Sequence, residues 1–176
     1  MKKIVLIFLI PLLLYGTSYD STLLQIGAKI FPKVALMEKG TKERIQSTVN
    51  FVIVTSLSNK AAAQRLSEIM EHQYNGTLAD HPLALFIVSP KEALEIKNAH
   101  SFVLLMDPDD SILPMVLEHA AKTKTLTFSF DPLLLQKGAA VSLYIGRSVK
   151  PYINLATLKQ VPFTFEYGFL KLSQPY

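Results

Sequence analysis

The sequence predicts an α/β fold: a single-domain three-layer sandwich with a mostly parallel central sheet and a C-terminal β-hairpin. Short apolar runs, which suit strands buried on both faces, alternate along the chain with amphipathic segments, and this order is typical of parallel sheets. The last third instead alternates apolar and polar residues around a short turn, which is typical of a hairpin. The chain of 176 residues has the length of one well-buried domain.

The first 18 residues, MKKIVLIFLIPLLLYGTS, have the three parts of a secretory signal peptide. Two lysines precede an apolar core, and Gly16 and Ser18 supply the small side chains of a cleavage site. The apolar core is shorter than the about 20 residues that span a bilayer, which disfavours a membrane anchor. We expect cleavage near Ser18, export to the periplasm and a mature domain of residues 19–176.

Helices and strands are predicted in turn over the next 120 residues or so. Residues 20–36 have helical spacing behind a capping Asp20, although Gly27 and Pro32 weaken the pattern. Apolar runs predict strands at residues 49–55, 83–88, 101–106 and 126–130. Helices are predicted at residues 58–73, 90–97 and 112–122, the last interrupted by Pro114, with a helical turn ending at 137. The charged segment 37–47 predicts a surface connection.

Residues 137–155, KGAAVSLYIGRSVKPYINL, predict two strands joined at Gly146-Arg147-Ser148. Pro151 cannot donate to a ladder, so we expect its nitrogen on an open side of the sheet. Asn154 is placed to cap a helix over residues 155–159. Residues 163–172 are apolar and aromatic and fit either a strand or a helix.

The composition disfavours several classes of function. The 16 basic and 14 acidic residues left after cleavage are scattered, so they indicate no nucleic-acid partner. The absence of cysteine excludes disulfides, thiolate metal sites and thiol redox chemistry. His72, His81, His100 and His119 have no metal-ligand spacing, and we expect them to be solvated or to cap. No nucleophile or phosphate-binding motif is present, so we expect neither an enzyme nor a cofactor.

Asp107, Asp109 and Asp110 are the best candidates for a ligand or partner site, because open parallel sheets bind ligands beyond the carboxyl ends of their strands. The same residues suit a helix cap, where the helix dipole stabilises acidic groups, and we favour this interpretation. Arg147 at the hairpin tip is a second candidate, for an anion, against the commoner solvated turn.

The order of elements over residues 98–173 resembles the YfiR-like family of bacterial periplasmic proteins. The resemblance rests on Gly138 opening the first hairpin strand, Arg147 at the tip, and a closing Leu-Lys-Leu at 170–172. It rests equally on the Ile-Asn-Leu that follows the hairpin: Ile153, Asn154 and Leu155. The chain departs from some members in having no cysteine, which removes any redox response.

The resemblance implies a periplasmic regulatory protein that acts through protein–protein contacts. In the family this action restrains an inner-membrane diguanylate cyclase and lowers cyclic di-GMP signalling. The implied partner is a protein, such as an inner-membrane signalling protein, and a homodimer is left open. This hypothesis predicts an exposed apolar patch.

The alternative hypothesis is a small periplasmic solute-binding protein of an uptake or sensing system. Its pocket is expected at the strand ends near Ser56, Ser89 and Asp107. A closed pocket with convergent polar groups there would favour this alternative, and a filled surface would count against it.

Overall fold

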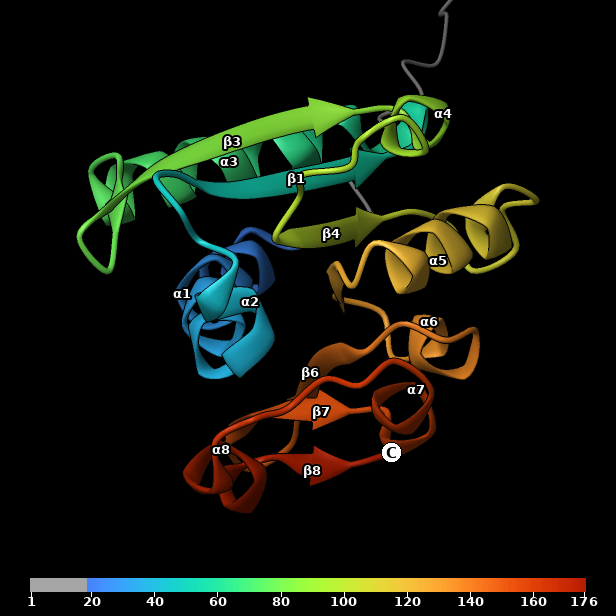
Figure 1. The fold of residues 1–176 in the computed structure, drawn as a ribbon. Helices are drawn as coiled ribbons and strands as arrows, with labels where there is room; N and C mark the ends of the chain where they lie inside the picture. The colour runs from blue at the N-terminus through green and yellow to red at the C-terminus, as the bar shows by residue number, and fades with distance from the viewer. Residues whose placement is uncertain (1–18) are drawn as a thin grey trace, which may run out of the picture.

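The computed structural model describes residues 19–176, which form one sheet with helices on both faces (Figure 1). Its eight strands are β1 (Val49–Thr55), β2 (Thr77–Leu78), β3 (His81–Val88), β4 (Ser101–Leu105), β5 (Leu126–Ser129), β6 (Val141–Ile145), β7 (Val149–Ile153) and β8 (Gln174–Pro175). The α-helices are α1 (Ser21–Met37), α2 (Lys39–Glu43), α3 (Lys60–Tyr74), α4 (Pro90–Ala93), α5 (Leu113–Lys122), α6 (Leu133–Gln136), α7 (Leu155–Gln160) and α8 (Tyr167–Leu172). The predicted signal peptide, residues 1–18, lies outside the described residues.

The strands lie in the order β2-β3-β1-β4-β5-β6-β7-β8. The five strands from β3 to β6 in this order run parallel to one another, whereas β7 returns antiparallel to β6 and completes the predicted hairpin. The two-residue strands β2 and β8 are the outermost ones. These findings confirm the predicted α/β sandwich with a mostly parallel sheet and a C-terminal hairpin.

The sheet separates two apolar cores. Residues of α1, α3 and α8 pack on one face, and residues of α4, α5 and α6 pack on the other. In β1, Phe51 and Ile53 face the first core while Val52 and Val54 face the second. Both faces of such a strand are buried, which explains the nearly continuous apolar runs in the sequence. Among residues 19–176, no helix has the length and apolar character needed to cross a membrane.

Helix α1 begins as predicted but does not end at its proline. The Asp20 carboxylate accepts a hydrogen bond from the Thr22 N–H, and the helix continues through Pro32. Gly27, which weakens the helical pattern in the sequence, is required by packing. A Cβ at this position would lie 2.2 Å from Cε1 of Phe130, far closer than carbon atoms can approach.

Several local predictions are wrong. Residues 37–47 are more than a surface connection, because Glu38 and Thr41 are buried around the short helix α2. Pro114 does not interrupt α5, because it lies in the first turn, where N–H groups have no helical partner. The helix predicted for residues 90–97 ends at Ala93. The segment 163–172, left open between strand and helix, contains α8.

In the hairpin, Ile145 of β6 lies opposite Val149 of β7, next to the turn. The Asn154 N–H donates to the Ala140 carbonyl at 2.9 Å, which identifies this pair as hydrogen-bonded. Alternation along an antiparallel ladder then places the Pro151 nitrogen on the side away from β6. On that side β8 pairs only with the two residues that follow Pro151, so the proline costs no ladder bond and the prediction of an open side is confirmed.

Candidate functional site

The acidic residues after β4 form a turn that their own side chains close. Asp107 Oδ1 accepts a hydrogen bond from the Asp109 N–H at 2.9 Å, and Asp110 Oδ1 accepts one from the Ile112 N–H at 3.2 Å. The exposed Asp109 carboxylate lies 3.6 Å from the Lys137 ammonium. Within residues 19–176 no cluster of His, Asp or Glu could hold a metal ion. The three aspartates therefore serve the turn before α5 and a surface ion pair.

The crevice between β1 and β4 is the point where the strand order reverses, and ligands of open α/β sheets bind at such a point. Here the side chain of Asn59 fills it. Asn59 is buried, and its Nδ2 donates to the Leu105 carbonyl and to Ser56 Oγ, both at 3.2 Å. Both donors of this amide are therefore used within the protein.

Tyr19 fills the neighbouring space near the ends of β4 and β5. Its ring meets that of Phe130 edge-on, with 5.6 Å between the ring centroids. Burial, together with the charges of Asp131 and Asp107, raises the pKa of Tyr19 to about 12. The phenol is thus neutral and packed at all physiological pH values. This edge of the sheet is largely filled, which counts against a solute pocket at Asp107.

A small hollow of about 260 Å³ remains at the carboxyl ends of β1 and β3. Thr55, Ser56 and Ser89 contribute hydroxyl groups to it, beside apolar Leu57 and Ile87. The Ser89 hydroxyl already accepts a hydrogen bond from the N–H of Glu92, in the capping box of α4. The fold brings Ser56 and Ser89 together as predicted, but Asp107 does not line this hollow.

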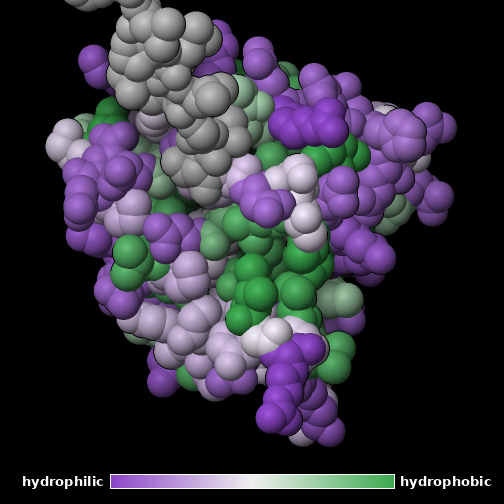
Figure 2. Space-filling view, turned by 180° about the vertical axis from the view of Figure 1, so that it is seen from behind, coloured by the Kyte–Doolittle hydropathy of each residue, from purple (hydrophilic) through white to green (hydrophobic). Residues whose placement is uncertain are grey.

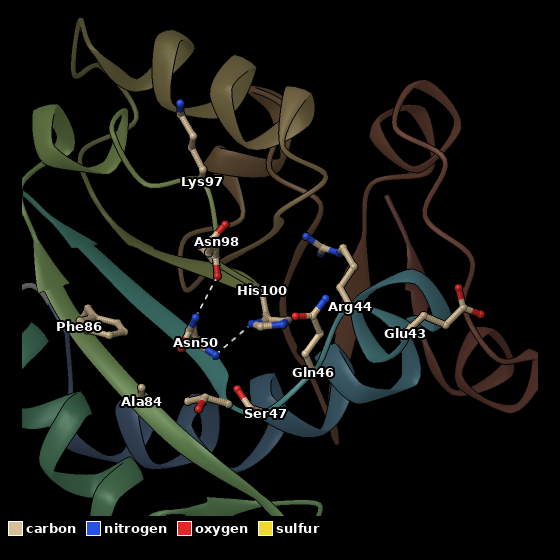
Figure 3. A pocket seen from close by; sticks show the side chains of 12 residues that line it. Glu43, Arg44, Gln46, Ser47, Asn50, Ala84, Phe86, Lys97, Asn98 and His100 are labelled. Atoms are coloured by element: carbon tan, nitrogen blue, oxygen red, sulfur yellow. Dashed lines mark hydrogen bonds between the residues drawn. The ribbon is translucent and has the colours of Figure 1, made fainter.

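A wider hollow of about 750 Å³ lies at the other end of the sheet, where β1 and β4 begin (Figure 3). Its wall is mostly polar. Asn50 lies between Asn98, whose carbonyl accepts from Asn50 Nδ2 at 3.1 Å, and His100 (Figure 3). Phe86 of β3 stands on the opposite side. No sequence motif marked this hollow, because its residues come from three separate segments.

His100 is buried rather than solvated, and of the two roles expected for it the structure has the cap, here of a backbone N–H at the start of β1. Its Nδ1 accepts a hydrogen bond from the Asn50 N–H at 3.0 Å, which requires an unprotonated Nδ1. Burial lowers the pKa of His100 below its ordinary value. The ring is therefore held in its neutral form and joins the starts of β1 and β4. His119 is also structural, since its Nε2 lies 2.7 Å from the Ile96 carbonyl oxygen.

The residues that carry the family resemblance are mainly structural. Gly138 has φ of +114°, a conformation that side chains disfavour, and its carbonyl accepts from Thr157 Oγ1. Ile153 is part of the core, whereas Leu155 is exposed on the surface of α7. Asn154 caps α7 as predicted, because its Oδ1 accepts from the Thr157 N–H at 3.0 Å. Its Nδ2 also donates to the Leu135 carbonyl at 2.6 Å, so it ties α6 to α7.

Arg147 lies at the exposed tip of the hairpin, and within residues 19–176 no ion pair joins it to Asp107, Asp109 or Asp110. Among the residues that the structure describes, its guanidinium makes no hydrogen bond or ion pair. Lys150, three residues further along the same hairpin, is exposed as well. The tip therefore presents two cations to solvent.

Large apolar side chains are exposed mainly in the last third of the chain. Of the thirteen such side chains within residues 19–176, nine lie there: Leu133, Tyr144, Ile145, Val149, Leu155, Tyr167, Leu170, Leu172 and Tyr176. We call these nine residues the C-terminal surface, which extends over both faces of the hairpin, since Tyr144 and Ile145 are adjacent in β6 and point to opposite sides. Figure 2 shows hydrophobic side chains gathered in the middle and lower part of one face, with hydrophilic ones around them.

Glu38 is a structural residue that the sequence did not reveal. Its side chain is only 2% exposed and accepts hydrogen bonds from three backbone N–H groups, those of Gly40, Thr41 and Thr164. Its backbone also bridges Phe165. Glu38 therefore joins the end of α1 to the segment that leads into α8, across 126 residues of sequence.

Comparisons with known proteins support the fold and no closer relationship. No family model matches the chain, and no curated protein matches it. The fold is similar to that of a conserved domain protein from Vibrio cholerae O1 biovar El Tor, with a TM-score of 0.59, 11% identity, and 86% of this chain and 59% of that chain covered. It is also similar to the ABC domain in complex with L-Trp from Streptococcus pneumoniae, with a TM-score of 0.53, 13% identity, and 82% and 59% covered. The chain thus spans about three fifths of either structure.

Proposed function

We propose that the chain is a periplasmic regulatory protein that acts by binding another protein through its C-terminal surface. The observation that carries the proposal is the concentration of exposed large apolar residues in the last third of the chain. Single exposed apolar residues are normal on proteins, but grouped ones mark interaction sites. Ile145 and Val149 illustrate the grouping, because they lie opposite each other at the tip and are 59% and 37% exposed.

The charges around the tip indicate what the partner surface is like. Arg147 lies in the turn between the apolar pair, Lys150 follows Val149 on the other face of the hairpin, and both are exposed. An apolar centre with a charged rim is the usual composition of a protein interface. The matching surface on the partner would be apolar with acidic groups at its edge, and those groups would speed encounter and select orientation.

The YfiR-like resemblance suggests the class of partner. By that resemblance, the chain restrains the periplasmic part of an inner-membrane diguanylate cyclase and lowers cyclic di-GMP signalling. At the carboxyl ends of β1, β4 and β5, the side chains of Asn59, Tyr19 and Asp107 bond or pack within the protein. This supports a role in binding another protein rather than a solute at these strand ends. A regulator of this kind is not an enzyme and uses no cofactor.

The test is an affinity capture from the periplasmic and inner-membrane fraction with the tagged chain. We expect recovery of a membrane protein that carries a cytoplasmic cyclase domain. The double variant Ile145→Thr/Val149→Thr keeps β-branched residues in the strands and should lose this partner. Met115→Gln, an equally exposed site on α5, is the matched control and should retain it. Capture that is unchanged by the double variant would refute the proposed surface.

A second candidate function is solute binding, favoured by the hollow that Ser56 and Ser89 line at the ends of β1 and β3. One structure with a similar fold holds L-Trp. At about 260 Å³ the hollow is smaller than most ligand pockets, which measure roughly 300 to 1,000 Å³. Calorimetric titration with L-Trp and other amino acids tests this candidate: saturable heat that Ile87→Asp abolishes would favour it over the protein-binding role.

A further inference from the structure

The outer edge of β3 is only partly covered. β2 pairs with His81 and Pro82 at the start of the strand, and the Leu83 N–H donates to the Gly76 carbonyl. From Ala84 to Val88, no strand among the described residues pairs with this edge. The other side of the same segment pairs in parallel with β1. The end of β3 is therefore an open sheet edge.

The hydrogen bond of Leu83 fixes which backbone groups point outward. Successive residues of a strand direct their N–H and C=O groups to opposite sides. Because the Leu83 N–H points away from β1, the backbone groups of Leu85 and Ile87 do so as well. These N–H and C=O groups have no strand partner in the part of the chain that the structure describes.

The open edge of β3 also lacks the features that protect sheet edges from pairing. Natural edges are short, charged, or interrupted by proline. β8, at the far end of the sheet, has two residues, one of which is Pro175. By contrast, the segment LALFIV of β3 has no charge and no proline, and Phe86 and Ile87 are 47% and 37% exposed.

We infer that this edge pairs antiparallel with β3 of a second copy of the chain, which makes one continuous sheet across a two-fold axis. The axis passes beside Phe86, so that Leu85 of one copy faces Ile87 of the other. In this register the outward N–H and C=O groups of Leu85 and Ile87 in each copy meet a partner. The two Phe86 residues face each other in a non-hydrogen-bonded pair, where side chains are closest.

A second copy fits this edge because the segment is self-complementary. The pairing about Phe86 is symmetric, as a two-fold interface requires, and each copy offers the same contacts. Leu83 to Val88 contain no ionisable group, so the two copies bring no like charges together. Phe86 and Ile87, which are exposed in a single copy, become buried. The interface lies at the opposite end of the sheet from the C-terminal surface, so the inference does not depend on the proposed function.

The cysteine-free chain permits a direct test by cross-linking. Opposed residues of a non-hydrogen-bonded pair have Cβ atoms about 4.5–5.5 Å apart, within reach of a disulfide after a small adjustment. We expect Phe86→Cys, purified from the periplasm and oxidised at low concentration, to form a covalent dimer. Tyr167→Cys, a more exposed site on α8, is the control and should remain mostly monomeric. Equal cross-linking at both sites would overturn the inference.

Sedimentation of the unmodified chain gives an independent readout. We expect a dimer that Phe86→Glu dissociates, because the substitution places two carboxylates opposite each other. Ile87→Pro should also dissociate it, because it removes an outward N–H and leaves the bonds to β1 intact. Circular dichroism verifies that each variant is folded. A monomeric wild-type chain, or a dimer that survives both substitutions, would refute pairing through β3.

Discussion

The parallel part of the sheet and the C-terminal hairpin region differ in how they use their side chains. In β1, β4 and β5 every strand residue except Asn50 is buried, and the polar groups at the strand ends bond to the protein itself. In β6, β7 and α8, apolar residues cover one side of the core and also extend into solvent. Burial on both faces makes the first region a source of stability. The second region adds less stability and leaves surface free for recognition.

Two buried side chains contribute specific polar contacts between the regions. Glu38 binds the segment before α8 from the end of α1, and Asn154 binds α6 from the start of α7. Both residues are buried, and loss of either side chain leaves backbone groups without a partner. Substitution of either residue removes a polar contact between the regions and leaves the apolar core that they share in place.

The largest effect is expected in the core of the parallel region. Phe128 is fully buried, and its ring stacks with those of Phe31 and Phe51. The ring centroids are 4.8 Å and 6.4 Å away, respectively. Phe128→Ala removes a packed ring, and we expect a loss of about 3–5 kcal/mol in the free energy of unfolding, measured by urea denaturation. Tyr167→Ala, on the exposed α8, should change it by less than about 0.5 kcal/mol. Similar losses at the two sites would contradict the division between the regions.

Glu38→Ala should give the next largest effect, because it leaves three backbone N–H groups without an acceptor. Charge-assisted hydrogen bonds contribute about 1.5–3 kcal/mol, and we expect a loss in that range in the same denaturation experiment. Hydrogen exchange should show the loss of protection around Phe165 and α8. Glu43→Ala, an exposed acid on α2, is the control and should have little effect. Intact protection at α8 would show that Glu38 does not hold this segment.

Asn154→Ala should lower the free energy of unfolding by about 1–2 kcal/mol, since it removes the cap of α7. Asn154→Asp separates its two roles. The aspartate keeps the acceptor for the Thr157 N–H but loses the donor to the Leu135 carbonyl. If the cap dominates, Asn154→Asp retains most of the stability, and if the bond to α6 dominates, both variants lose similar amounts.

His100 makes stability depend on pH at the start of β1 and β4. Its folded pKa is lowered by burial, so the unfolded chain binds a proton more readily below about pH 6.5, the ordinary histidine value. The stabilising contribution is complete above that pH and is lost as the pH falls through the folded pKa. We expect melting temperatures to drop between pH 7 and 5, and His100→Gln to reduce this drop. His72→Gln, at an exposed site, is the control substitution.

The sequence predicted the parallel region well because burial on both faces leaves a strong local signal. The range of β1 was predicted as observed, the hairpin was predicted with its turn at Gly146-Arg147-Ser148, and Asn154 was identified as a cap. The structural role of Glu38 was missed because its carboxylate and the Thr164 N–H that it binds are 126 residues apart in the sequence. Asn59 and Tyr19 were missed for a similar reason. Whether a strand-end crevice is open or filled depends on side chains that only the folded chain brings together.

The smallest effect on stability is expected at Arg147, where the sequence suggested both an anion site and a simple turn. The guanidinium is exposed at the hairpin tip, so Arg147→Ala should change the free energy of unfolding by less than about 0.5 kcal/mol. Binding is where the two interpretations differ. If Arg147 belongs to the rim of the C-terminal surface, Arg147→Glu should slow association with the captured partner several-fold in surface plasmon resonance, and salt should reduce the difference. Lys97→Glu controls for net charge, because Lys97 is a basic residue in the hollow where β1 and β4 begin. If both substitutions slow association equally, Arg147 contributes only through the net charge of the protein. The hairpin tip is then a solvated turn.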